Sequence, residues 1–382
     1  MNSYPTENIR NVVLVGHGGA GKTSLAEALL FKSGAITRMG KTTDENTTTD
    51  FDEEEHRRQI SINTALAPVE WNEHKINVLD APGYADFVGE MRAAMRVADL
   101  AVFVVSGVEG LEVQTQVAWN LADELSLPRL IFVNKLDREN ASFRRTLEQL
   151  REAFGMGVAP LSLPLGREHE FRGVISVIDE AAFAYDSAGK TTEEPIPDDR
   201  RARVDEVRTA LLDSVAETND ELLERYLESG ELTREEIVSS LRDGLAQASV
   251  FPVLVGAATS LIGVDRLADI IVSAGPSPLD RPPAETEDGK TVEAKPDGPM
   301  SALVFKTMTD PYVGRVSFFK VYSGIVKGDG TVHNTTQKSD ERTGHVFTMR
   351  GKNQEPLTEV VAGDIGAIAK LAHTATGDTI AD

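Results

Sequence analysis

The 382-residue sequence contains no cysteine, which excludes disulfide bonds and thiolate metal sites. It has no apolar run near the ~18 residues that a membrane-spanning helix needs, and its first residues lack the basic and apolar pattern of a targeting segment. Positive charge is scarce: 39 lysines and arginines face 61 acidic residues, for a formal net charge of −22. Bulk charge therefore gives no attraction to free nucleic acid. These absences predict a cytoplasmic protein without a membrane or free nucleic-acid partner.

A glycine-rich stretch between an apolar strand and a helical pattern stands near the N-terminus. Residues 12–15 are apolar, residues 16–23 fit G-x-x-x-x-G-K-[ST], and apolar helical spacing begins at Ser24. Glycines let backbone N–H groups wrap a phosphate chain, and the helix N-terminus adds its positive dipole end. We expect Lys22 to reach the terminal phosphates and Thr23 to ligate Mg²⁺. The predicted phosphate-binding residues are Gly16, His17, Gly18, Gly19, Ala20, Gly21, Lys22, Thr23 and Ser24.

The polar residues 31–60 have two interpretations. Their composition, with an acidic run at 50–55, is that of a solvated loop, but a long loop after a phosphate-binding helix is also typical of a switch segment. Two β-like runs follow at 60–66 and 75–79, with a turn at 71–74. Directly after the second run, Asp80 is placed to hold Mg²⁺ through water, and the N–H of Gly83 can approach the γ-phosphate.

Strands and helices then alternate. Apolar runs at 100–105, 129–133 and 250–255 predict buried strands, and helical patterns cover 85–97 and 112–125. This alternation predicts an α/β domain with a mixed, mostly parallel sheet and helices on both faces. In such folds the ligand binds at the C-terminal ends of the strands, and the motifs follow strands at those ends.

The tetrad at residues 134–137 predicts which base is bound. An ionised aspartate only accepts hydrogen bonds, and its two oxygens can pair with two adjacent donors. Guanine offers N1–H and its 2-amino group as such a pair, whereas adenine does not, so Asp137 should select guanine, with xanthine as the conceivable substitute. We expect Asn134 to help read the base and the Lys135 stem to lie over the ring plane.

These motifs together resemble the translational GTPases, specifically elongation factor G. The resemblance rests on residues 16–24, 58–62, 80–87 and 134–137, and it continues at 311–324, 362–368 and 376–380, which resemble strands of that family's second domain, a β-barrel. It covers essentially the whole chain. It implies GTP and GDP as ligands, Mg²⁺ as cofactor and the ribosome as partner, with Thr23, Ser61 and Asp80 as the metal-binding residues.

Several positions depart from the family pattern. Gly19 stands where the family has an aspartate that helps to hold a monovalent cation, and Ser61 replaces the switch threonine but keeps its hydroxyl. Tyr84 replaces the histidine that positions the attacking water, and a phenol titrates near 10. Ala257 and Ala258 stand in the turn whose backbone N–H contacts guanine O6 in the family. The departures resemble the divergent, second-copy branch of the family.

The chain divides into an expected GTPase domain at 1–283, a linker at 284–299 and a β-barrel at 300–382. The linker lies in a stretch, 276–299, that is rich in proline, acidic residues and glycine. Between about 158 and 250 the resemblance implies an inserted α+β subdomain, and the residues agree. The β-like runs lie at 171–178 and 181–185, and the helical patterns at 198–217, 219–228 and 233–249. Because the family continues beyond the barrel, we expect this chain to be an N-terminal fragment.

The predicted activity is hydrolysis of GTP to GDP and phosphate in association with the ribosome, in a translocation-type or recycling role. Lys22, Gly83 and Tyr84 are the expected catalytic residues. The alternative is a GTP-switched binding module with little hydrolysis, which Tyr84 and Gly19 favour. An ATPase is a weaker alternative, because the tetrad at 134–137 argues against adenine.

Overall fold

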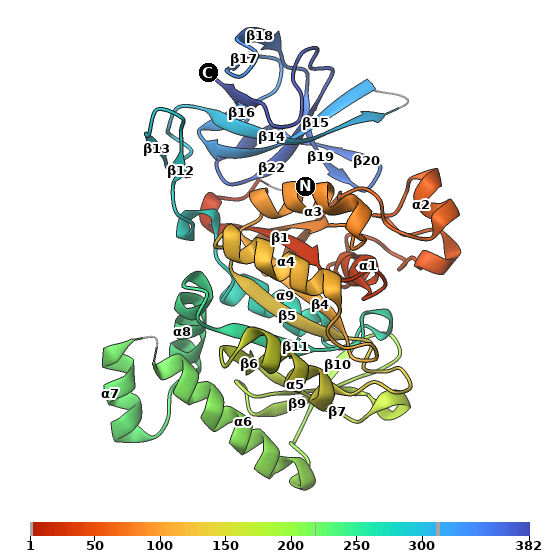
Figure 1. Cartoon of the computed structure of the whole chain (residues 1–382), viewed down its shortest axis with the longest axis vertical. Helices are drawn as coiled ribbons and strands as arrows, with labels where there is room; N and C mark the ends of the chain where they lie inside the picture. Colours follow the sequence, from red (N-terminus) through yellow and green to blue (C-terminus); the bar gives the residue numbers. More distant parts are fainter. Residues whose placement is uncertain (1–2, 218, 311–313) are drawn as a thin grey trace.

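The computed structural model describes residues 3–217, 219–310 and 314–382. Figure 1 shows three regions stacked along the long axis, with a helix-covered sheet in the middle, an inserted α/β region below it and a β domain above it. Within these residues no helix is both long and apolar enough to cross a bilayer.

The central sheet has seven strands in the order β2-β3-β1-β4-β5-β11-β6. Neighbouring strands are parallel except for β2 and β3, which form an antiparallel hairpin. Every residue of β1, β4 and β5 is buried, as expected of strands covered on both faces. The mixed, mostly parallel sheet is thus confirmed. Its strands are β1 (Ile9–Val15), β2 (Ala65–Trp71), β3 (His74–Asp80), β4 (Leu100–Ser106), β5 (Arg129–Asn134), β6 (Val158–Pro160) and β11 (Phe251–Val255).

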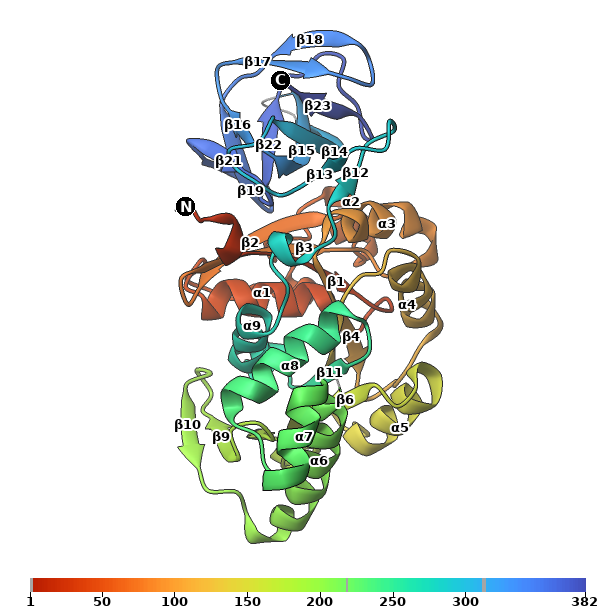
Figure 2. The same ribbon diagram turned by 90° about the vertical axis from the view of Figure 1, so that its left-hand side faces the viewer.

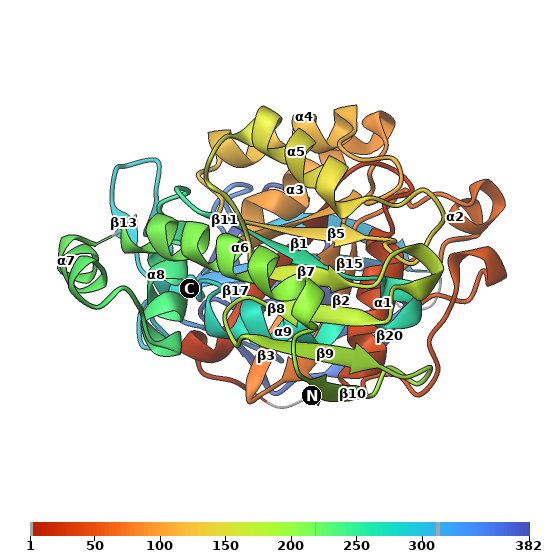
Figure 3. The same cartoon turned by 90° about the horizontal axis from the view of Figure 1, so that it is seen from below.

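Helices cover both faces of this sheet, as predicted (Figures 2 and 3). One face carries α1 and α9, and the other carries α3, α4 and α5. On the second face, Trp119 of α4 stacks on Phe154 of α5 with 3.7 Å between their ring centroids. The helices are α1 (Lys22–Lys32), α3 (Val88–Val97), α4 (Val113–Glu124), α5 (Phe143–Phe154) and α9 (Val264–Ser273).

Two details of the region between α1 and α3 differ from the prediction. The run at 60–66 was expected to be a strand, but β2 begins at Ala65, because Glu55 Oε1 accepts the N–H groups of Ile62 (2.9 Å) and Asn63 (3.0 Å) and keeps them out of the sheet. The helix expected at 85–97 has its first turn, Ala85–Phe87, in the 3₁₀ form.

The stretch at 31–60 is also more regular than either interpretation of its sequence. It contains a short 3₁₀ turn at Thr42–Asp44 and the helix α2 at Glu53–Arg58. Asp52 and Glu55 form a reciprocal capping box at the start of α2. Part of the acidic run therefore caps and begins a helix.

The inserted region combines a four-stranded antiparallel sheet, in the order β10-β9-β8-β7, with helices α6 to α8. Strand β9 matches the predicted run at 181–185, whereas β8 is shorter than the predicted 171–178. Thr233 and Glu236 form a capping box at the start of α8, within the predicted helical pattern at 233–249. The elements are β7 (Ser162–Leu165), β8 (Gly173–Ser176), β9 (Ala181–Tyr185), β10 (Thr191–Glu194), α6 (Asp198–Ala216), α7 (Asp220–Ser229) and α8 (Arg234–Ala246).

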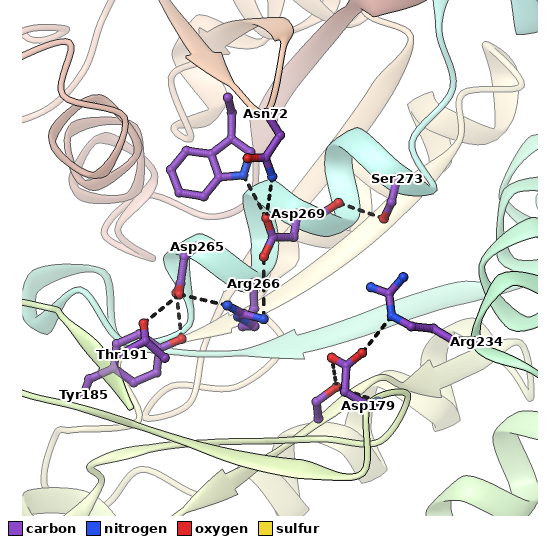
Figure 4. Close-up of polar contacts among 11 residues, drawn as sticks. Asn72, Asp179, Tyr185, Thr191, Arg234, Asp265, Arg266, Asp269 and Ser273 are labelled. Atoms are coloured by element: carbon purple, nitrogen blue, oxygen red, sulfur yellow. Dashed lines mark hydrogen bonds and ion pairs between the residues drawn. The ribbon is translucent and has the colours of Figure 1, made fainter. Parts of the chain in front are cut away.

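Two aspartates on α9 fasten this helix to elements on either side of it (Figure 4). Asp265 accepts hydrogen bonds from the Tyr185 hydroxyl at 2.6 Å and from the Thr191 hydroxyl at 2.9 Å. One turn later, Asp269 accepts from the Trp71 indole N–H at 2.9 Å. The inserted sheet and the β2–β3 hairpin are therefore both attached to the helix that follows β11.

The C-terminal region is an antiparallel β domain with an eight-stranded sheet, in the order β18-β17-β23-β14-β15-β22-β19-β20, and a two-stranded β16–β21 sheet. A small hairpin, β12 (Ala284–Glu285) with β13 (Thr291–Val292), precedes it. Pro311, Tyr312 and Val313 of the predicted motif at 311–324 lie outside the described residues. The strands are β14 (Ser301–Asp310), β15 (Gly314–Ser323), β16 (Ile325–Lys327), β17 (Thr331–Asn334), β18 (Ser339–Arg342), β19 (Val346–Arg350), β20 (Asn353–Pro356), β21 (Glu359–Val361), β22 (Ile365–Ala369) and β23 (Thr379–Ala381).

Buried ion pairs join the β domain to the central sheet. Lys75 of β3 lies 2.7 Å from Asp364, and Lys320 of β15 lies 2.6 Å from Asp99. Between these pairs, the amide of Asn11 on β1 donates to Asp99 Oδ2 and to the Gly363 carbonyl, each at 2.7 Å. Since charges this deeply buried need their partners, the network fixes the β domain against β1 and β3.

Replacing Asp364 with leucine tests this interface. The variant leaves the Lys75 ammonium buried without its carboxylate, so we expect the free energy of unfolding to fall by about 3–5 kcal/mol. The double variant Lys75→Met/Asp364→Leu removes both charges and should recover most of that loss. Urea denaturation measures both changes.

The matched control is Glu124→Ala, which breaks an exposed ion pair of 3.4 Å with Arg92. It should cost less than about 1 kcal/mol, as exposed pairs do. If Asp364→Leu cost no more than this control, the buried network would not hold the two regions together.

Candidate nucleotide-binding site

The predicted phosphate loop connects β1 to α1 at the carboxyl edge of the central sheet. Gly16 has φ +139° and Gly21 has φ +97°. A Cβ at Gly16 would lie 2.3 Å from the Val104 carbonyl oxygen, and one at Gly21 would lie 2.4 Å from the Asn134 amide nitrogen. Gly21 also precedes α1 without a side-chain cap, so the first N–H groups of the helix can bind an anion.

Lys22 is buried at the start of α1. Its ammonium donates to the carbonyl oxygens of Gly16 at 3.1 Å and His17 at 2.9 Å. Burial lowers the pKa of Lys22 to about 8, against the raising effect of nearby carboxylates, the largest being that of Asp80. A Cβ on Gly83 would lie 2.3 Å from this ammonium, so the Gly83 backbone passes directly beside it. The structure thus brings Lys22 and Gly83, both predicted site residues, together.

Hydroxyl and carboxyl oxygens gather beside Lys22. The hydroxyls of Thr23 and Ser61 lie 3.1 Å apart, and Thr49 donates to Asp80 Oδ2 at 2.8 Å. The other oxygen of Asp80 is buried and has no hydrogen-bond partner among the described residues. Burial raises the pKa of Asp80, and burial together with the Asp80 charge raises the pKa of Asp50 to about 7.

This oxygen-rich cluster suits a hard divalent cation. Mg²⁺ prefers oxygen ligands and commonly keeps several waters, and its charge would relieve the two crowded carboxyls. In the described ranges no three His, Asp or Glu side chains group together for metal binding, so hydroxyls, water and phosphate must complete the coordination. The sequence predicted Thr23, Ser61 and Asp80 here, but it missed Thr49 and Asp50, which lie in a segment with no recognisable spacing.

At the other end of the pocket, the amide of Asn134 joins two loops. Its Nδ2 donates to the Ala20 carbonyl, and its Oδ1 accepts from the Ala258 N–H, both at 2.9 Å. The Ala257 N–H donates to the Ile262 carbonyl at 3.0 Å. The two N–H groups expected near guanine O6 therefore already have protein partners, which the sequence could not reveal.

Asp137 is held differently from Asn134. Its Oδ2 accepts a hydrogen bond of 2.5 Å from the Ser260 hydroxyl, whereas its buried Oδ1 makes none within the described chain. Lys135 adopts φ +62° and lies 3.7 Å from Glu109. Oδ1 thus keeps its capacity to accept from a ligand, and Oδ2 keeps a second lone pair.

Tyr84 lies directly over the phosphate loop. A Cβ at Gly18 would lie 2.6 Å from the Cζ atom of the Tyr84 ring, so only glycine leaves space for the ring there. The side chain is 39% exposed and its ring lines the pocket.

A cavity of about 810 Å³ is lined by phosphate-loop residues together with Ser61, Gly83, Tyr84, Asn134 and Lys135, and its volume suits a nucleotide. The inserted region contributes Ser187 and Ala188 from the β9–β10 loop, which sequence reasoning missed because nothing local links them to the motifs. A larger hollow of about 950 Å³, between α5 and the inserted region, contains none of the phosphate-loop residues. The chemistry therefore belongs to the smaller cavity.

Comparison with known proteins agrees with this geometry. Residues 7–277 match the Elongation factor Tu GTP binding domain, and residues 299–382 match Elongation factor G domain 2. The chain belongs to the elongation factor G-like translational GTPases. A crystal structure of a Thermus thermophilus protein is 34% identical with a TM-score of 0.89, and the alignment covers 98% of this chain and 54% of that one. This chain thus spans about half the length of that relative.

The predicted family and fold class are confirmed by these matches, and the chain carries the GTP-binding domain of that GTPase family. In this elongation factor G-like chain, the site residues at 16–24, 61, 80–84 and 134–137 lie at one edge of the central sheet.

Replacing Asp137 with asparagine tests base recognition. The amide puts a donor opposite a guanine donor, so we expect GDP affinity to fall about 100-fold, since two hydrogen bonds to a charged group are disturbed. Xanthosine diphosphate, which offers an acceptor there, should bind more tightly than to the unmodified protein. Competition against a fluorescent nucleotide measures both affinities.

The control is Asp179→Asn in the inserted region, where Asp179 pairs with Arg234 (Figure 4). It should leave both affinities unchanged. Equal losses for the guanine and xanthine nucleotides in Asp137→Asn would contradict a base-reading role.

Proposed function

We propose that this chain binds GTP with Mg²⁺ and hydrolyses it to GDP and phosphate in association with the ribosome. The observation that carries the proposal is the convergence of Lys22, Thr23, Ser61 and Gly83 on one cavity that Asn134 and Lys135 line at its far end. Family membership supports the nucleotide and the GTPase class. The ribosome and a cytoplasmic location come from family resemblance, and translocation-type and recycling-type roles both remain compatible with it.

Nucleotide binding would replace the hydrogen bonds that Lys22 makes with carbonyl groups of the phosphate loop. Its ammonium would exchange the carbonyls of Gly16 and His17 for phosphate oxygens, while the N–H groups of residues 17–22 surround the phosphate chain. Thr23 and Ser61 would hold Mg²⁺ directly and Asp80 through water. When bound, Mg²⁺ neutralises charge that develops on the phosphates.

Hydrolysis depends more on how the protein positions the water and the phosphates than on covalent chemistry by its side chains. A water oxygen forms a bond to the γ-phosphorus while the bond to the β–γ bridging oxygen breaks, GDP keeps that oxygen, and the water proton passes to phosphate or solvent. Gly83 brings its N–H beside the γ-phosphate. Tyr84 lies where its hydroxyl can hydrogen-bond the attacking water. Because its phenol is neutral, it supplies no positive charge to the site.

The second candidate is a GTP-switched binding module with little hydrolysis. The close packing of Tyr84 on Gly18 favours it, because a ring fixed over the phosphate loop can retain nucleotide without activating water. Gly19, Ser61 and Tyr84 together also support our assignment to the divergent branch of the family. We further propose the division into 1–283 with an insertion at about 158–250, a linker at 284–299 and a β-barrel at 300–382.

The deciding experiment measures GTP turnover with and without ribosomes, using the full-length protein and its Tyr84→His and Tyr84→Phe variants. We expect ribosomes to stimulate the unmodified protein at least about tenfold, and Tyr84→Phe, which lacks the water-binding hydroxyl, to lose most of that stimulation.

Stimulation confined to Tyr84→His would instead identify the natural protein as a GTP-dependent binder. If no variant turned over GTP although GTP still bound, the enzymatic proposal would fail while nucleotide binding remained.

A further inference from the structure

Ser260 is the one side chain that hydrogen-bonds the Asp137 carboxylate in the described chain, and it stands 123 residues further along the sequence. A serine in a turn usually bonds a backbone group nearby. Here the hydroxyl reaches across the end of the sheet and donates to Asp137 Oδ2 at 2.5 Å. Such a distant partner needs an explanation beyond turn formation.

The turn that carries Ser260 is tightly closed. Ala257 and Ile262 exchange backbone hydrogen bonds of 3.0 and 3.1 Å, and the Ser260 N–H donates to the Ala257 carbonyl at 3.1 Å. The same turn is joined to the end of β5 through the Ala258 N–H and Asn134. The backbone of Ser260 is thus fixed in a position from which its hydroxyl reaches Asp137.

Asp137, in contrast, has few restraints of its own. Its Oδ1 makes no hydrogen bond within the described residues, and the guanidinium of Arg138 lies 3.9 Å away. The terminal torsion of an aspartate has a broad energy well, so without the hydrogen bond from Ser260 the carboxylate could rotate. Recognition of two adjacent donors requires both oxygens to face the base edge together.

We propose that Ser260 is a specificity-positioning residue for the guanine base. Its hydroxyl fixes the plane of the Asp137 carboxylate so that both oxygens can accept from N1–H and the 2-amino group. Oδ2 retains a second lone pair after accepting from Ser260, and Oδ1 accepts no hydrogen bond within the described residues. This inference rests on the proposed guanine-nucleotide site and names a residue that acts through Asp137 without needing to touch the base.

The test compares GDP with IDP, whose base lacks the 2-amino group. A carboxylate held in one plane can accept hydrogen bonds from both donors of guanine. A carboxylate that rotates can still accept one from the single N1–H of hypoxanthine. In Ser260→Ala we expect GDP affinity to fall about tenfold and IDP affinity to fall about threefold or less, because the bidentate pair needs orientation. The ratio of the two affinities is the readout, measured by competition on the full-length protein.

Two further variants separate the hydroxyl from packing. Ser260→Thr keeps the donor and should keep the GDP-to-IDP ratio, whereas Ser260→Val has a similar shape without the donor and should lose it. The matched control is Ser273→Ala on α9, whose hydroxyl donates to the Asp269 carbonyl at 2.8 Å (Figure 4). It should leave both affinities unchanged.

The two affinities measured for each variant decide whether Ser260 positions Asp137. An unchanged ratio in Ser260→Ala and Ser260→Val, or an equal fall in both affinities, would overturn the proposal and leave Ser260 a structural residue. If Ser260→Ala does not fold, the Thr and Val pair decides. Absence of guanine-nucleotide binding in the unmodified protein would instead refute the site itself.

Discussion

The nucleotide pocket depends on one buried amide, that of Asn134. This side chain ends β5, donates to the phosphate loop at Ala20 and accepts from the turn at Ala258, so three separate segments meet on one residue. The glycine at position 21 exists for the same reason, since any Cβ there would collide with the Asn134 amide nitrogen. The phosphate loop and the turn at Ala258 are therefore mechanically joined through one side chain.

Three carboxylates order the segment between α1 and α3. Glu27 accepts the N–H groups of Gly40 (3.0 Å) and Thr48 (2.8 Å), and Glu55 accepts those of Ile62 and Asn63. Glu90 of α3 accepts from the Thr64 N–H at 2.8 Å and from Lys306 of the β domain at 2.5 Å. The segment that holds Ser61 is thus linked to α3 and to β14, so a change at the Ser61 hydroxyl can reach the β domain through few contacts.

The sequence predicted most of what local chemistry controls. The glycine and lysine pattern located the phosphate loop, apolar runs located the buried strands, and Asp137 followed from hydrogen-bonding chemistry. What it missed depends on pairing between distant segments. Thr49 and Asp50 are ordinary loop residues until folding places them against Asp80, and Ser187 comes from an inserted hairpin. Glu55 likewise looked like part of a solvated acidic run, yet it is buried and withholds residues 62 and 63 from the sheet.

The departures from the family pattern at positions 19 and 84 have different physical meanings. Gly18 and Tyr84 form one unit, because the ring occupies the space of any side chain at position 18, so position 18 cannot gain a side chain unless the ring moves. Gly19 is different: no atom outside its chain neighbours lies within 4 Å of a Cβ built there, although its φ of +83° restricts which residues fit. Aspartate and asparagine tolerate left-handed backbone better than other residues with side chains. Position 19 could therefore regain the aspartate of the family pattern with little rearrangement, whereas position 84 could not regain histidine without leaving a gap above Gly18.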